Sequence, residues 1–379
     1  MSTSMNGELP KFIRQFTPNW FAVTMGTGVL ALCLNLLSPL APFFHQIGSG
    51  LWMVNIGLFA LFTALYTLRW LFHFDEARRV FDHSVMSMYF GTIPMGLATI
   101  VNGTLAFGPH FFGSAATPIA QTLWWVDVAL SVACGLLVPY FMFTRQNHSV
   151  DKMTAVWLLP IVACEVAAAS GGLLAPHLAP EAGYGVVIVG YVLWALSVPL
   201  AMSILAILLL RLAVHSLPER DMAASGWLSL GPIGTGSLAL LLLGGDAPSL
   251  FARAGLPWAG DAAHGIGVVG GLILWGYGVW WLALAVMKTA HYIKRGMPFN
   301  LGWWGFTFPL GVYTLATLSL AQNTHLALFS VIGDGLVLCL AIFWAIVAAR
   351  TLRGALGGTL FIAPCLCAAI PDRFEADAV

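Results

Sequence analysis

Residues 303–311 read WWGFTFPLG, a proline set among bulky rings in a stretch apolar enough to cross a bilayer. Pro309 cannot donate a backbone N–H, and its ring clashes with the preceding helical turn. Unpaired backbone groups are costly in hydrocarbon, so such a break is tolerated where it is buried in protein or lines a cavity. The stretch therefore predicts an interrupted membrane helix beside a cavity.

The composition of the chain indicates an all-α integral membrane protein. Of its 379 residues, 59% are hydrophobic and only 8% are charged, whereas soluble domains carry about 25% charged residues. The net charge is zero and there is no basic run, so we expect no nucleic-acid partner. The cysteines lie in apolar spans or in a single C-x-C at 365–367, and we expect neither a metal nor a cofactor. Phosphate-loop and nucleophile–base motifs are missing, so we do not expect an enzyme.

Ten apolar segments are long enough to cross the membrane. They cover residues 18–37, 50–71, 84–104, 120–143, 153–174, 184–214, 222–243, 264–290, 300–320 and 325–350. With ten crossings, every Lys and Arg except Arg253 falls on one side. Basic residues remain cytoplasmic, which predicts a multi-pass protein of the plasma (inner) membrane with both termini inside. We divide the chain into a cytoplasmic segment 1–16, a transport domain 17–352 and a cytoplasmic tail 353–379.

Proline recurs at similar intervals in alternate spans. Pro94, Pro160, Pro232 and Pro309 are 66, 72 and 77 residues apart, and three of the four begin a Pro-x-Gly pattern. This phase predicts mid-span kinks and a two-helix unit used five times, giving five parallel-repeat hairpins around a central pore. The alternative is that proline and glycine are simply frequent in membrane helices.

Glycines and hydroxyl side chains gather near these prolines. We expect the pore to be lined by Gly26, Thr27, Gly28, Thr92, Pro94, Gly96, Thr99, Pro160, Ser170, Pro232, Gly234, Thr235, Thr307, Pro309 and Gly311. Lys and Arg are missing from the middle of the spans, and there is no carboxylate ring of the kind that a cation channel uses. Broken helices expose N–H groups and positive dipole ends, which favour anions. Alternatively, the hydroxyls bond the carbonyls of their own helices.

Few charged residues lie at membrane depth, where charge is costly and usually functional. Glu165 in the fifth span and His83 at the entrance of the third are candidates for a coupling or proton role. The alternative for Glu165 is a protonated or hydrogen-bonded carboxyl. We expect structural hydrogen bonds for Asp127 and Asp334.

Three stretches resemble the tellurite-resistance/dicarboxylate transporter superfamily: FTPNWFAVTMGTGVLAL, FGTIPMGLATIVNG and PFNLGWWGFTFPLGV. This superfamily includes slow-type anion channels, malate permeases and sulfite efflux pumps, and the resemblance extends from residue 16 to about 353. Residues 124–172 and 91–102 look most like the sulfite efflux branch.

The resemblance implies ten helices around a quasi-fivefold pore, and a homo-oligomer that is a trimer, as in the channel branch, or a dimer. It implies export of sulfite or bisulfite; a C4-dicarboxylate (malate) transporter and a less selective anion channel are the alternatives. It also implies that Phe308 occludes the pore. We expect Phe306 to pack elsewhere, and Trp303 and Trp304 to anchor the cytoplasmic end.

Overall fold

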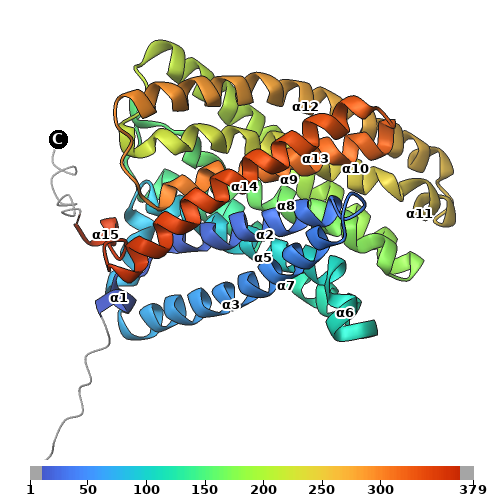
Figure 1. The fold of residues 1–379 in the computed structure, drawn as a ribbon, viewed down its shortest axis with the longest axis horizontal. Coiled ribbons are helices and arrows are strands. Elements are labelled where there is room, and N and C mark those ends of the chain that lie inside the picture. Colours follow the sequence, from blue (N-terminus) through green and yellow to red (C-terminus); the bar gives the residue numbers. More distant parts are fainter. Residues whose placement is uncertain (1–10, 368–379) are drawn as a thin grey trace, which may run out of the picture.

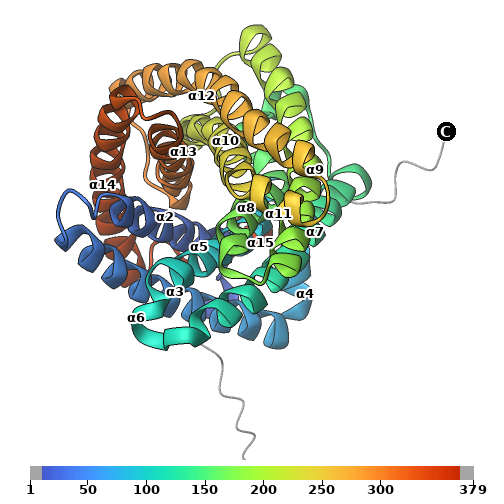
Figure 2. The same cartoon turned by 90° about the vertical axis from the view of Figure 1, so that its right-hand side faces the viewer.

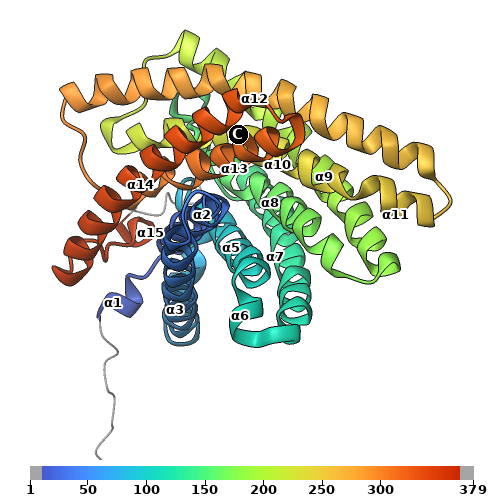
Figure 3. The ribbon, with the colours of Figure 1, turned by 45° about the vertical axis from the view of Figure 1, so that its right-hand side comes forward.

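The computed structural model describes residues 11–367, which form helices and short connections with no strand among them. Residues 1–10 and 368–379 lie outside this description, so the two predicted terminal segments are followed only over 11–16 and 353–367. The long helices run across the molecule, with the short helices α1 (Lys11–Arg14) and α15 (Pro364–Cys367) near one end of the bundle (Figures 1 and 3).

Five buried helices within residues 11–367 form an inner ring. They are α2 (Ala22–Leu36), α5 (Thr92–Ala106), α8 (Leu159–Leu174), α10 (Leu230–Gly245) and α13 (Phe308–Thr324). Each packs against the next in this order, and α13 packs against α2, so the ring closes (Figure 2).

Five longer helices cover the ring within the same part of the chain. They are α3 (Phe43–Phe72), α7 (Ala116–Thr144), α9 (Pro180–Val214), α12 (Pro257–Lys294) and α14 (Ala327–Leu356). Each packs against the inner helix that precedes it in the chain. Their outward faces expose many large apolar side chains, as expected of a surface that meets lipid.

Each inner helix is preceded by a 3₁₀ helix. These are η1 (Pro18–Phe21), η3 (Met86–Gly91), η6 (Ala155–Leu158), η8 (Arg220–Ser229) and η9 (Leu301–Phe306). We call the end of the bundle where the five inner helices begin the proximal end, and the opposite end the distal end. The remaining short elements are α4 (Phe74–Ala77), η2 (Arg78–Asp82), α6 (Gly108–Phe112), η4 (Gly113–Ala115), η5 (Val150–Lys152), η7 (Ala175–His177) and α11 (Ala247–Arg253).

The four prolines in phase do not kink the middle of a helix, so that prediction was wrong. Pro160 and Pro309 are the second residues of α8 and α13, and Pro94 and Pro232 are the third residues of α5 and α10. The first N–H groups of an α-helix have no partner within the helix, so proline removes nothing there. The prolines mark the change from a 3₁₀ turn to an α-helix.

Eight helices in the described part of the chain are long and apolar enough to cross a membrane, or nine if the bent pair Phe74–Asp82 and Met86–Ala106 is one span. The fold is therefore all-helical with eight or nine candidate spans. Helix α13 has 17 residues and is not among them, so ten crossings remain a prediction. The outer helices α3 and α12 begin earlier than predicted, at Phe43 and Pro257.

Candidate functional site

A small cavity lies on the axis of the inner ring at its proximal end. All five repeating units line it, through residues that include Met25, Thr92, Leu159, Leu228 and Phe308. Its volume is about 20 Å³, which is enough for about one water molecule. The axis is therefore narrow at this level.

The electrostatics of this proximal cavity come from helix ends. The inner helices begin beside it, and each helix N-terminus carries about half a positive charge from its aligned peptide dipoles. The N–H groups at these starts bond carbonyls of the preceding 3₁₀ helices, so the positive potential comes from the aligned dipoles. Their convergence makes the cavity favourable for a small anion.

A second cavity, of about 230 Å³, lies at the distal end of the same axis. It is lined by all five inner units, and its polar residues are Asn35, Asn102, His177, Ser319 and Gln322. None of these five residues is among the path residues predicted from the sequence. They occupy the last turns of the helices or the adjoining segment, where polar residues are common for reasons unrelated to function.

A barrier separates the two cavities. On α13, Phe308 borders the proximal cavity and Leu315 borders the distal one, and seven residues of helix span about 10 Å. On α10, Thr235 lies seven residues before Leu242, which lines the distal cavity, and it follows Leu228 of η8, which lines the proximal cavity. Seven residues of α-helix make nearly two turns, so Thr235 shares the face of Leu242 and lies within the barrier.

The predicted hydroxyls differ in their hydrogen bonds. Thr92 lines the proximal cavity and donates to Pro18 O at 3.0 Å and Tyr89 O at 2.7 Å. Thr27 instead accepts from the indole of Trp344 on α14. Thr235 is buried, and its Oγ1 has no hydrogen-bond partner among the described residues.

The remaining predicted hydroxyls bond to their own segments. Ser170 donates to Val166 O and Thr307 to Trp304 O. Thr99 donates to Gly96 O and also accepts from the amide of Asn55 on α3. The alternative in which hydroxyls bond nearby carbonyls therefore describes these three residues.

The predicted glycines lie where inner helices touch. A Cβ added at Gly234 would lie 2.7 Å from Tyr313 N, and one at Gly311 would lie 2.5 Å from Val29 Cγ1. Glycines at three further positions face side chains of the neighbouring units: Gly26 faces Thr307, Gly28 faces Thr99 and Gly96 faces Thr24. Small residues let membrane helices approach closely, and these five glycines set the tight packing of the ring.

The rings of the 303–311 stretch point in different directions. Phe308 borders the proximal cavity, whereas Phe306 packs 5.6 Å from the rings of both Trp227 and Phe343. Trp303 is partly exposed beneath the guanidinium of Arg350.

Trp304 departs from the prediction that it anchors the membrane boundary. Its side chain is only 2% exposed, and its indole donates to Thr351 Oγ1 at 3.0 Å. The ring borders the proximal cavity and fills the space beside Gly26. Because Gly26 has no side chain, the indole of Trp304 packs directly against α2. It therefore does not reach the lipid boundary.

The carboxyl groups at membrane depth lie away from the axis. Glu165 is fully buried beside Ser197 of α9, and neither of its oxygens has a hydrogen-bond partner within the described residues.

The prediction of structural hydrogen bonds for Asp127 and Asp334 was wrong. Both oxygens of the buried Asp127 are unpaired, and Asp334 is only half-buried on α14 without a bonding partner in the described chain. The thiols of Cys134 and Cys164 lie near Asp127 but form no hydrogen bond with it, and thiols are weak donors.

His83 lies in the turn between η2 and η3, outside the candidate spans. Its Nδ1 accepts the backbone N–H groups of Val85 and Met86, both at 3.2 Å. Burial lowers the pKa of this imidazole from its ordinary value near 6.5. His83 therefore holds the start of η3 in its neutral form.

Two buried cations near the proximal end were not predicted as functional residues. Arg69 donates to Phe16 O at 2.5 Å and to Cys365 Sγ at 3.5 Å. Arg211 donates to Asp151 O at 3.1 Å through Nε. From the sequence, these two arginines are recognised only as basic residues at the cytoplasmic ends of spans. Their hydrogen-bond partners are mainly backbone carbonyls, which every residue has, so no sequence pattern reveals them.

A closed helical ring with an apolar outer surface and a constricted, anion-favouring axis defines a multi-pass membrane transport protein. The chain belongs to the voltage-dependent anion channel family, whose model matches residues 15–352. This match confirms the resemblance found in the sequence.

Relatives in this family have been named from several organisms. The chain is 39% identical over 342 residues to a sulfite efflux pump of Arthroderma benhamiae, covering 89% of this chain and 90% of the relative. It is 29% identical to an uncharacterised transporter of Methanocaldococcus jannaschii, over 92% and 96% of the two chains. It is 20% identical to a malic acid transport protein of Schizosaccharomyces pombe, over 88% and 77%.

Proposed function

We propose that this protein exports sulfite from the cytoplasm through a passage along the axis of the inner ring. The observation that carries the proposal is that five inner α-helices begin around the proximal cavity, because the positive ends of their dipoles favour a small anion without a fixed base. The 39% identity to a sulfite efflux pump over most of both chains supports sulfite as the anion.

A dicarboxylate such as malate fits the axis less well. Two carboxylates are usually held by charged partners such as the guanidinium forks of Arg. Among the described residues, no Lys or Arg lines either axial cavity. A less selective anion channel is the second alternative, because helix dipoles attract any small anion.

We further propose ten membrane crossings arranged as five parallel hairpins, each an inner helix followed by an outer one. Helix α13 is short by itself, but η9 and α13 together cover residues 301–324, enough to cross the hydrocarbon. The distribution of basic residues supports cytoplasmic termini, and the plasma (inner) membrane is the proposed location. Residues 17–352 would form the transport domain, in a homo-oligomer with one passage per protomer.

Within this passage, we propose Phe308 as the gate and Thr235 and Thr92 as hydroxyls that the anion meets. The small volume of the proximal cavity beside Phe308 supports a closed gate. The other predicted path residues would act by holding the ring narrow, because the glycines meet neighbouring helices and the hydroxyls of Thr27 and Thr99 accept hydrogen bonds from outer helices. Glu165 and His83 are proposed to couple transport to protons.

Reconstitution of the purified chain into vesicles tests this function. Vesicles loaded with sulfite, malate, sulfate, nitrate or chloride are compared with protein-free vesicles, with and without a pH gradient. We expect sulfite to leave faster than malate and faster than from the protein-free vesicles. Malate flux without sulfite flux would overturn the proposal, and equal flux of all five anions would favour the less selective channel.

A further inference from the structure

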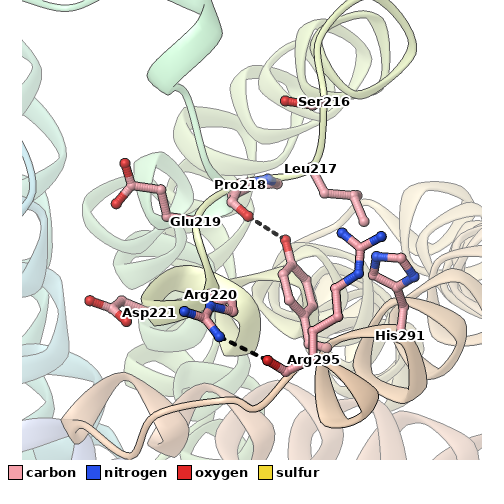
Figure 4. A pocket seen from close by; sticks show the side chains of 9 residues that line it. Ser216, Leu217, Pro218, Glu219, Arg220, Asp221, His291 and Arg295 are labelled. Atoms are coloured by element: carbon pink, nitrogen blue, oxygen red, sulfur yellow. Dashed lines mark hydrogen bonds between the residues drawn. The ribbon is translucent and has the colours of Figure 1, made fainter.

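A cavity of about 730 Å³ lies beside the inner ring, between the segment that follows α9 and the last turns of α12 (Figure 4). None of its lining residues borders either axial cavity. Two hydrogen bonds join its walls: Tyr292 Oη donates to Pro218 O at 2.6 Å, and Arg220 Nη1 donates to Arg295 O at 2.8 Å. These bonds hold the cavity open in a defined shape.

Charges of opposite sign lie on opposite sides of this cavity. The guanidinium of Arg295 lies beside the imidazole of His291, whereas Glu219 and Asp221 lie on the opposite side together with Arg220 (Figure 4). Within residues 11–367, neither carboxylate forms an ion pair with Arg220 or Arg295. One side of the cavity is therefore cationic, and the other carries a net negative charge because two carboxylates outnumber the guanidinium of Arg220.

The cavity adjoins apolar surface. Val214 is 67% exposed at the end of α9, Leu217 lines the cavity, and Ile293 is 64% exposed between the lining residues Tyr292 and Arg295. Exposed apolar residues at the ends of long apolar helices lie where lipid chains meet headgroups. A ligand here can place a polar group in the cavity and hydrocarbon against the helices.

We infer that this cavity binds the phosphoethanolamine headgroup of a membrane phospholipid. The phosphodiester accepts hydrogen bonds from Arg295 and His291, as basic pockets at membrane boundaries do for lipid phosphates. The primary ammonium donates to Glu219 and Asp221. Phosphocholine lacks the N–H donors for these carboxylates, and phosphoglycerol lacks the positive charge. The cavity volume lies within the usual range for small-ligand sites, about 300–1,000 Å³.

Native mass spectrometry of the full chain in detergent tests this inference. The protein is titrated separately with phosphatidylethanolamine, phosphatidylcholine and phosphatidylglycerol that carry identical acyl chains, and with water-soluble phosphoethanolamine. We expect phosphatidylethanolamine to bind about tenfold more tightly than the other two lipids, since charged hydrogen bonds are the strong ones. Arg295→Gln, and the double variant Glu219→Gln with Asp221→Asn, should each remove most of this preference.

Arg253→Gln serves as the matched control, because Arg253 is an exposed arginine at the end of α11 and outside the cavity. Equal binding of the three lipids, or an equal loss of preference in Arg253→Gln, would overturn the inference. Tighter binding of phosphatidylglycerol that increases in the double variant would also overturn it, by identifying an anionic-lipid site. Soluble phosphoethanolamine that binds as tightly as the lipid would exclude a membrane lipid as the specific ligand.

Discussion

Phe308 and Phe306 are two residues apart, but their rings meet different surroundings. Phe308 borders the axial cavity, whereas Phe306 packs against η8 and α14. The α-helix begins at Phe308, and Phe306 is the last residue of the 3₁₀ helix η9. The change of helix type between them allows the ring of Phe308 to face the axis while the ring of Phe306 packs against the neighbouring helices.

Replacing Phe308 with Ala should open the axis. A minor open state is commonly populated at about 0.1–10%, so removing the ring should raise sulfite flux per protein by at least about tenfold. Flux in proteoliposomes, normalised to reconstituted protein, measures the effect. Phe306→Leu is the control, and it should lower thermal stability without raising flux. Unchanged flux in well-folded Phe308→Ala would exclude Phe308 as the gate.

Thr235→Val should slow anion flux while leaving the fold intact. Valine keeps the shape of threonine but removes a hydroxyl that has no hydrogen-bond partner in the described structure, so no buried partner is left unpaired. Loss of one hydrogen bond of about 1.4 kcal/mol to the passing anion corresponds to about a tenfold slower flux. Thr122→Val on the exposed surface of α7 is the control. Equal flux in both variants would remove Thr235 from the passage.

At the level of helices, the tight contact between α10 and α13 depends on one glycine. A Cβ at Gly234 would lie 2.7 and 2.8 Å from the N and Cα atoms of Tyr313, and this backbone cannot rotate away. Gly234→Ala should therefore destabilise the protein by about 1–3 kcal/mol. Gly231→Ala, on the same helix but facing open space, should be tolerated. Thermal unfolding in detergent separates the two, and equal melting temperatures would contradict the packing argument.

The turn that starts η3 should respond to pH through His83. Its folded-state pKa is depressed, so the neutral form stabilises the fold above the ordinary pKa near 6.5, and this stability is lost as the pH falls towards the folded-state value. Protonated imidazole cannot accept the two backbone N–H groups. We expect the melting temperature to fall as the pH drops below about 6.5. His83→Asn, which can accept but does not titrate, should lose this dependence, and an unchanged pH profile would disprove it.

Sequence periodicity identified the inner helices but could not orient them. The prolines at 94, 160, 232 and 309 gave the phase of the repeat, because each marks the start of an inner helix. Thr27 and Thr235 both stand beside glycines, yet only Thr27 is bonded to an outer helix. The inner helices are apolar on every side. No polar face in the sequence therefore distinguishes the side of a helix that faces the axis from the side that packs against other helices.

At the level of the whole molecule, α13 decides the number of crossings. If α13 crosses, Lys294 and Leu326 lie on opposite sides of the membrane; if it does not, they lie on the same side. A chain with one crossing fewer would place Arg350 and Arg353 outside, against the tendency of basic residues to remain cytoplasmic. The distribution of charge therefore favours ten crossings over nine.

Single cysteines introduced into a variant without the six native cysteines test this count. Lys294 and Leu326 are both exposed, so a membrane-impermeant thiol reagent can reach either one from its own side. We expect Leu326→Cys to react in intact cells and Lys294→Cys to react only after lysis. Glu181→Cys and Asp151→Cys calibrate the outer and inner sides. Reaction of both test positions from one side would mean that α13 enters the membrane without crossing it. The passage would then lack a fifth membrane-crossing inner helix.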